Sequence, residues 1–410
     1  MLKTILALNL FLLPLGSGAQ NFGFRLEPGK SKVVIPVEVI NNMVIVPVLL
    51  DNQIPLKFIL DTGVRSTVLT QKIYSDMLGL TYSKIHSISG PGGEKLVDAY
   101  VTDNVTLDLP GVHGEGHSML VLDKDYLELR NYLGTEVHGV LGYELFSRFI
   151  VQMDYERKRI ILYLPQKFKK KASYQTLPIQ IQDTKPFLLT PTRMTATTQL
   201  ETKLLIDTGA SHGLILEPET DERIAIPEKN MESVIGRGLG GVITGRIGRI
   251  HSIQLGKYNI EGIIANFPDP NSYTDTLFRK ESLHRNGAIG GEIMSRFKVI
   301  FNYSKEEMYL KKSSSFKKKF NYDMSGLTIK AKGARLRSFE ITDLREGSPA
   351  AKAGLMTGDN ILFIGGNPVF NMNLNTVNGF FNSKPGKRVS VEVEREGKRL
   401  KFEFYLVNQI

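Results

Sequence analysis

Two aspartates at the ends of apolar runs are the side chains of this sequence best placed to do chemistry. Asp61 ends the run in "FILDTG" and Asp207 ends the run in "LLIDTG", so each begins an Asp-Thr-Gly turn. An ionised carboxylate in an apolar site is costly without a partner, and the two turns predict that each aspartate is the partner of the other. Two carboxyls in contact would share one proton. The ionised member could then take a proton from water while the protonated member donates to an amide carbonyl, without a metal ion.

The residues after each aspartate suit that arrangement. Gly63 and Gly209 permit a tight turn and let backbone amides approach the carboxylates. The hydroxyls of Thr62 and Thr208 can bond backbone across the interface and pin the two turns together. Which aspartate acts as acid and which as base stays open at this point.

An internal repeat supports the pairing. Asp61 and Asp207 lie 146 positions apart, and "HGVLGYELFSRF" recurs as "NGAIGGEIMSRF" at nearly the same separation. Such a repeat predicts two similar units related by a pseudo-twofold axis. Each unit also has a glycine-rich stretch after its aspartate, and we expect these stretches to be hairpins that fold over a bound chain as lids. The glycines are Gly90, Gly92 and Gly93 in the first unit and Gly238, Gly240 and Gly241 in the second.

The repeat is mainly strand. Segments such as "KVVIPVEVI", "MVIVPVLL" and "IILYL" are β-branched and roughly alternating, and Gly, Pro, Asn and Asp bound them. We therefore expect two all-β lobes, at 20–164 and 165–312, with a basic linker at 165–171. A second basic linker at 313–319 leads to a small α+β domain at 320–410.

The first nineteen residues predict export. Lys3 precedes an apolar stretch from Ile5 to Leu15, and Ser17 and Ala19 lie three and one before a plausible cleavage position. This pattern is typical of a secretory signal peptide, and it is too short to span a membrane. We expect an exported protein, periplasmic or extracellular, with no transmembrane segment.

Composition excludes some classes of protein. The chain has no cysteine, so disulfides and thiolate metal sites are not available. The net charge of +10 is concentrated in "QKFKKK" and "KKSSSFKKKF" between apolar segments, and no nucleic-acid-binding module accompanies it. We expect solvated linkers, no nucleic-acid partner, and no metal or other cofactor.

On these motifs the two lobes resemble aspartic proteases, nearer to the retropepsin-like group than to the large pepsins. The resemblance rests on the two Asp-Thr-Gly turns and on Val140-Leu141-Gly142 and Ala288-Ile289-Gly290. It implies bilobal, β-barrel-like lobes, with Asp61 and Asp207 as the catalytic pair and the two glycine-rich stretches as flaps. A peptide or protein substrate would lie extended between the lobes, and the monomer would suffice for catalysis. Val64 and Ala210 depart from the Ser or Thr that pepsin-like sites carry after the glycine.

The tail resembles a PDZ domain, most strongly in "EGSPAAKAGLMTGDNILFIGGNPV". Ser348 suits the N-cap of a short helix and Gly354 its end. By that resemblance Ser325, Gly326, Leu327 and Thr328 form the loop that receives a peptide carboxylate, and the peptide pairs as an added strand with the residues that follow. The ligand would be a protein C-terminus or an internal peptide.

Three further motifs match signatures of other sites. "GASHG" matches a nucleophile elbow at Ser211 with His251 or His284 as base, but proline breaks the helix that an elbow requires. "GRGLGG" matches a dinucleotide fingerprint, but the residues after it alternate like a strand. "HGEGH" has metal-like spacing only in a helix, so we expect a surface loop. A peptide-binding adaptor whose lobes do not cut remains the alternative function.

Overall fold

The apolar run that leads into Asp61 forms β5 (Ile54–Leu60), a central strand of the first lobe. Its last three residues are all buried, so the strand delivers the aspartate to the interior of the molecule. This computed structural model describes residues 22–93, 96–270 and 284–410. The predicted signal peptide lies outside the described residues.

A short strand inserted beside β5 organises the first lobe. β12 (Gly139–Leu141) runs parallel to β5 and antiparallel to β6 (Thr67–Leu69), with Leu141 opposite Leu60. The strand order of this sheet is β3 (Glu38–Ile40), β4 (Met43–Leu50), β5, β12, β6, β11 (His117–Leu122), β8 (Val97–Val105) and β7 (Lys84–Ile88).

The second lobe repeats this pattern. β25 (Gly287–Ile289) is parallel to β18 (Gln199–Ile206) and antiparallel to β19 (Leu214–Leu216). The order is β20 (Asn230–Gly238), β21 (Gly241–Arg249), β24 (Ile264–Pro268), β19, β25, β18, β17 (Lys185–Arg193), β22 (Ser252–Leu255) and β23 (Tyr258–Glu261). Both aspartates therefore follow the strand that pairs with an inserted strand.

A third sheet joins the lobes. Its order is β15 (Gln175–Pro178), β27 (Glu307–Lys312), β26 (Phe297–Asn302), β13 (Ile150–Asp154), β14 (Arg159–Tyr163) and β2 (Lys32–Pro36). β13 of the first lobe pairs with β26 of the second, and corresponding strands follow on either side. One apolar core contains buried side chains of both lobes, including Phe58, Phe146, Phe267 and Phe301.

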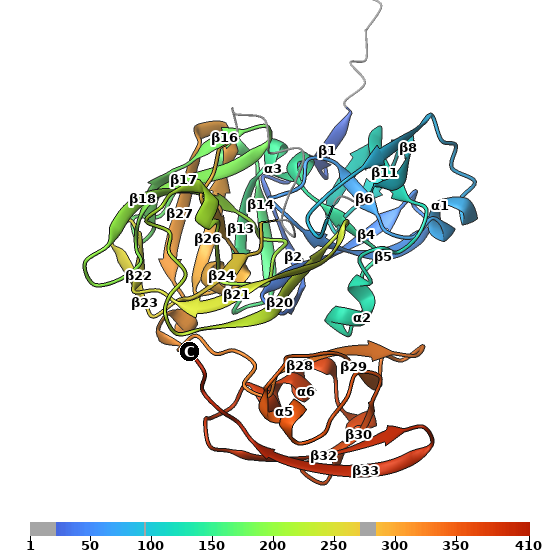
Figure 1. Ribbon diagram of the computed structural model, residues 1–410. Helices are drawn as coiled ribbons and strands as arrows, with labels where there is room; N and C mark the ends of the chain where they lie inside the picture. The colour runs from blue at the N-terminus through green and yellow to red at the C-terminus, as the bar shows by residue number, and fades with distance from the viewer. Residues whose placement is uncertain (1–21, 94–95, 271–283) are drawn as a thin grey trace, which may run out of the picture.

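The C-terminal domain lies below the two lobes in Figure 1 and has its own core. Its strand order is β28 (Leu327–Lys332), β29 (Ser338–Leu344), β30 (Asn360–Ile364), β32 (Arg388–Arg395) and β33 (Lys398–Tyr405). The Ser348 hydroxyl accepts from the Ala351 N–H at the start of α5 (Pro349–Lys352), which is the predicted N-cap, and α6 (Leu374–Phe381) is the longer helix.

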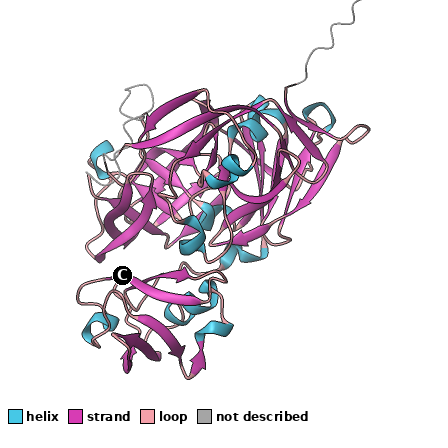
Figure 2. Cartoon of the chain, turned by 90° about the vertical axis from the view of Figure 1, so that its right-hand side faces the viewer, coloured by secondary structure: helices cyan, strands magenta, loops and turns pink. Residues whose placement is uncertain are grey.

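The chain is mainly β with two lobes and a smaller α+β domain, as the sequence predicts; strands dominate Figure 2. Among the described residues the sheets are open and none closes into a barrel. No helix in this part of the chain is long and apolar enough to cross a membrane.

The prediction of a surface loop at "HGEGH" was wrong. Residues 112–115 form β10, which pairs with β1 (Gly23–Leu26), and His117 begins β11. The His117 ring is buried, lies 4.2 Å from the Phe24 ring, and places its Nδ1 2.6 Å from Glu144 Oε2. The N-terminal strand supplies the long-range partner that makes β10 a strand.

Candidate active site

The inserted strands fix the backbone of both aspartates. The N–H of Asp61 donates to the Leu141 carbonyl and the N–H of Asp207 donates to the Ile289 carbonyl, each at 2.9 Å. Gly142 follows the first of these strands, and a Cβ there would lie 2.3 Å from the Val64 carbonyl oxygen. The predicted apolar-apolar-glycine elements thus pack directly against the Asp-Thr-Gly turns.

Two buried threonines cross between the lobes. The N–H of Thr62 donates to Thr208 Oγ1 and the N–H of Thr208 donates to Thr62 Oγ1, both at 3.1 Å. The Thr62 hydroxyl also donates to the Ile206 carbonyl at 2.6 Å, and the Thr208 hydroxyl donates to the Leu60 carbonyl at 2.9 Å. Each turn is therefore anchored to the strand that carries the opposite aspartate.

This anchoring brings Asp61 and Asp207 together, and their side chains are hydrogen-bonded to each other. Gly63 N–H donates to Asp61 Oδ1 at 2.6 Å, and Gly209 N–H donates to Asp207 Oδ1 at 2.9 Å. Burial raises the pKa of Asp61 well above its usual range, and the charge of Asp207 raises it further. The amide donors of Gly63 and Gly209 oppose this shift without cancelling it.

The presence of glycine in both turns has a steric reason that the sequence did not reveal. A Cβ at Gly209 would lie 2.2 Å from Asp61 Cγ in the opposite lobe. A Cβ at Gly63 would lie 3.1 Å from Asp61 Oδ1 and 3.4 Å from Asp207 Cγ. Any side chain at Gly209 would push the two carboxyls apart.

The two glycine-rich stretches meet at their tips. The second is the turn of the β20–β21 hairpin, and the first follows β7. Gly240 N–H donates to the Pro91 carbonyl at 3.0 Å, and a Cβ at Gly92 would lie 2.3 Å from Gly241 O. Gly90 and Gly93 lie against Leu239 and Gly240, and a Cβ at Gly238 would lie 2.0 Å from the Pro91 carbonyl oxygen. Both predicted flaps thus join into one bridge.

Two buried side chains near the pair were not singled out from the sequence. The Tyr303 ring stacks on Phe146, and its hydroxyl has no hydrogen-bond partner among the described residues. Burial raises its pKa, and the nearby charge of Asp61 adds to the shift. Burial also lowers the pKa of His212 to about 4, which keeps that imidazole neutral. The tyrosine could have been found, because "DYERK" and "NYSKEE" place Tyr155 and Tyr303 at matching positions of the repeat.

The motifs "GASHG" and "GRGLGG" do not form the sites whose signatures they match. The residues after Ser211 form β19 rather than a helix, so "GASHG" is not built as a nucleophile elbow. "GRGLGG" spans the end of β20 and the flap turn. Within the described residues no group of three His, Asp or Glu side chains could hold a metal ion.

In the C-terminal domain the predicted carboxylate loop already holds a carboxylate of the same chain. Asp323 Oδ1 accepts from the N–H groups of Gly326 and Leu327 at 2.5 and 3.2 Å, and its oxygens accept from the Ser325 hydroxyl. Thr328 lies in β28, opposite Asp343 of β29. A peptide carboxylate would have to displace Asp323 to reach these amides.

Two protein-family models match these parts of the chain. A family model described as "Aspartyl protease" matches residues 46–145 and 195–287, and one described as "PDZ domain" matches residues 323–406. The first pair of matches includes both Asp-Thr-Gly turns and both flaps. None of the curated proteins compared with the chain matches it.

Proposed function

Because both lobes carry aspartyl protease family domains and the C-terminal domain is a PDZ domain, we propose that this chain is an aspartic endopeptidase. The contact between the carboxyls of Asp61 and Asp207, across two lobes pinned by Thr62 and Thr208, is the observation that carries the proposal. In this proposal the pair activates a water molecule against a peptide bond, and no cofactor takes part.

We propose that the two carboxyls share one proton in the free enzyme, because burial and the neighbouring carboxylate both raise the pKa of Asp61. The ionised member of the pair takes a proton from the attacking water. The protonated member donates its proton to the carbonyl oxygen of the substrate as the water oxygen adds to the carbon, which gives a tetrahedral diol. The carboxyl that took the proton from water then passes it to the leaving nitrogen, and the other carboxyl takes a proton back from a diol hydroxyl. The C–N bond breaks, an acid and an amine leave, and the pair regains its single proton.

The substrate class follows from the flaps. An extended peptide or protein segment would lie between the carboxyl pair and the bridge that Gly92 and Gly241 form, so the flaps must open to admit it. We propose that the enzyme acts as a monomer outside the cytoplasm, and that the PDZ domain binds a protein C-terminus or an internal peptide.

The proposal is tested by incubating the mature protein with a mixed peptide library from acidic to neutral pH. Asp61→Asn and Asp207→Asn should each lower cleavage by about 10³-fold, because each removes one partner of the acid–base pair. The matched control is Asp221→Asn, whose carboxylate pairs with Arg223 near the surface, and this variant should cleave like the parent.

Two outcomes would overturn the proposal. Peptide binding without cleavage by the parent at any pH would make the chain an adaptor with a protease-like fold. Cleavage that survives both aspartate variants and is lost in Ser211→Ala would make it a serine hydrolase.

A further inference from the structure

A short helical segment of the first lobe lies against the PDZ domain. It consists of α2 (Leu129–Leu133) with Glu128 and Gly134 on either side, both in the left-handed backbone region at φ 47° and 63°. Figure 1 shows α2 extending from the first lobe to β28 of the domain below it. We call residues 128–134 the clamp.

The clamp bonds to β28 and to the turn that follows it. Asn131 Nδ2 donates to the Ala331 carbonyl at 2.7 Å, and Arg130 Nη2 donates to the Ala334 carbonyl at 2.9 Å. The Glu128 carboxylate lies 3.4 Å from Lys330 Nζ. At the other end of the clamp, a Cβ at Gly134 would lie 2.6 Å from the Cβ of Leu374, the first residue of α6.

These contacts cover the part of a PDZ domain that takes peptides. β28 is the edge strand of its sheet and pairs only with β29 among the described strands. PDZ domains bind an extended peptide by adding it as a strand to an exposed sheet edge. Here the Asn131 side chain donates to the Ala331 carbonyl, so the clamp uses a backbone acceptor of this edge strand.

The same segment reaches a flap of the active site. Arg237 Nη2 donates to the Tyr132 hydroxyl at 3.2 Å, and the Arg237 guanidinium lies 5.1 Å from the centre of the Tyr132 ring. Arg237 is in β20 and directly precedes Gly238 at the flap tip. One turn of helix thus contacts both the edge of the PDZ sheet and the flap.

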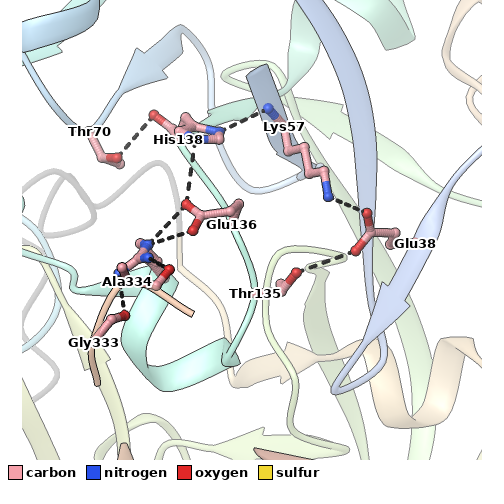
Figure 3. A network of polar contacts seen from close by, with 9 residues as sticks. Glu38, Lys57, Thr70, Thr135, Glu136, His138, Gly333 and Ala334 are labelled. Carbon is pink, nitrogen blue, oxygen red and sulfur yellow. Dashed lines mark hydrogen bonds and ion pairs between the residues drawn. The ribbon is translucent and has the colours of Figure 1, made fainter. Parts of the chain in front are cut away.

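A polar network ties the clamp to the interior of the first lobe (Figure 3). Arg130 Nε donates to both Glu136 oxygens at 2.8 and 2.9 Å, and Glu136 Oε2 lies 3.8 Å from His138 Nε2. The His138 N–H donates to the Lys57 carbonyl, the His138 carbonyl accepts from the Thr70 N–H, and His138 directly precedes β12. This network anchors the clamp to the first lobe, so displacement of the clamp from β28 would leave it attached to the lobe.

We propose that residues 128–134 are an internal ligand of the PDZ domain that holds the flap closed, and that an internal peptide binding along β28 displaces them and frees the flap. The carboxylate loop agrees with an internal ligand, because Asp323 already fills the amides that a free C-terminus would need. This inference rests on the proposed function for its effect on cleavage, but not for its effect on the flap.

A charge swap tests the clamp. The release variant carries Glu128→Lys and Asn131→Ala, which replaces the attraction to Lys330 by repulsion and removes the bond to Ala331. Adding Lys330→Glu restores the ion pair with reversed charges. Arg193→Ala, at an exposed arginine that bonds to Gln199 in the second lobe, is the matched surface control.

The readout is amide hydrogen exchange over 327–332 and 236–241 in full-length protein, with all variants made in the Asp207→Asn background. Release should speed exchange in both segments several-fold, the charge swap should slow it again, and the control should change neither. Faster exchange over 327–332 with unchanged exchange over 236–241 would refute the coupling, and no change in either would refute the clamp.

Binding of a probe peptide gives a second measurement. A synthetic peptide with the sequence of residues 126–136, blocked at both ends, should bind the release variant about tenfold more tightly than the parent, because the tethered clamp competes at a high effective concentration. Equal binding to both proteins would contradict the internal ligand.

Cleavage separates this inference from the proposed function. In chains with both aspartates, release should raise the rate of peptide cleavage several-fold, and a lower rate would contradict a flap held closed. If exchange responds as expected but no variant cleaves any peptide, the proposed function fails while the clamp stands.

Discussion

The glycine after each Asp-Thr pair decides how closely the two carboxyls approach. A Cβ at Gly209 would collide with the carboxyl of Asp61. The turn therefore leaves room for the opposite carboxyl only when this position has no side chain. The requirement is one of space across the interface, because Gly209 does not adopt a left-handed backbone. The residue type in this motif is therefore a consequence of the pairing.

Gly209→Ala should abolish cleavage while the protein stays folded. The new methyl would lie 2.2 Å from Asp61 Cγ, and the carboxyls must separate to admit it. Gly379→Ala is the matched control, because Gly379 is in α6 with open space around it. We expect the control to keep full activity and to gain about 0.5–1 kcal/mol in unfolding free energy from helix propensity. Activity and thermal unfolding measured on both variants check this, and an active Gly209→Ala would refute the close contact.

At the scale of elements, the loop before β28 contains an acid with an unusual environment. Burial raises the pKa of Asp323 to about 6, although the amides of Gly326 and Leu327 and the charge of Arg345 oppose the shift. A raised carboxyl pKa means that the folded domain binds the proton more tightly than the unfolded chain does. The stabilisation is complete below about pH 4, the usual carboxyl range, and is lost as the pH rises through about 6.

Asp323→Asn should remove this pH dependence. The parent should lose about 2 kcal/mol of unfolding free energy in the C-terminal domain between pH 4 and pH 7, and the variant should lose less because it has no proton to release. Denaturant unfolding of the full chain at a series of pH values measures the difference. Identical pH profiles for both proteins would mean that Asp323 titrates as an exposed acid.

Elements also show where sequence reasoning succeeds and where it fails. The cap at Ser348 and the β20–β21 flap were predictable, because propensity and glycine content act over a few residues. The buried His117 was not, because its burial depends on contact with Phe24 of β1, nearly a hundred positions away, and the preceding β10 depends on pairing with β1. The clamp was not predictable either, since nothing near Asn131 in the sequence indicates Ala331 as its partner.

At the scale of the whole molecule, the two lobes share a sheet. Val151 and Met153 of β13 lie opposite Phe301 and Val299 of β26, and the core on this sheet is continuous. The repeat predicted two facing lobes, but it did not predict that one sheet continues across their interface through the β13–β26 pair. Similarity between two halves reports their common fold, whereas the pairing of β13 with β26 joins strands that lie more than a hundred positions apart in the sequence.

Cutting the linker between the lobes should leave them together. If residues 166–171 are replaced by a specific cleavage site, the cut chain should elute as one species at micromolar concentration, because the shared sheet and the crossed threonines remain. Gel filtration of cut and uncut protein is the measurement. Two separated halves after cutting would show that the linker, and not the sheet, holds the lobes.

The proposed mechanism depends on one proton shared by Asp61 and Asp207. Carbon-13 labelling of the aspartate carboxyls, with NMR titration of the parent and of Asp207→Asn, measures this most directly. In the parent, Asp61 should titrate well above the usual value of about 3.9, and in the variant its pKa should fall because the repulsion from Asp207 is gone. A carboxyl of Asp61 that titrates near the usual value in both proteins would contradict the shared proton and the mechanism built on it.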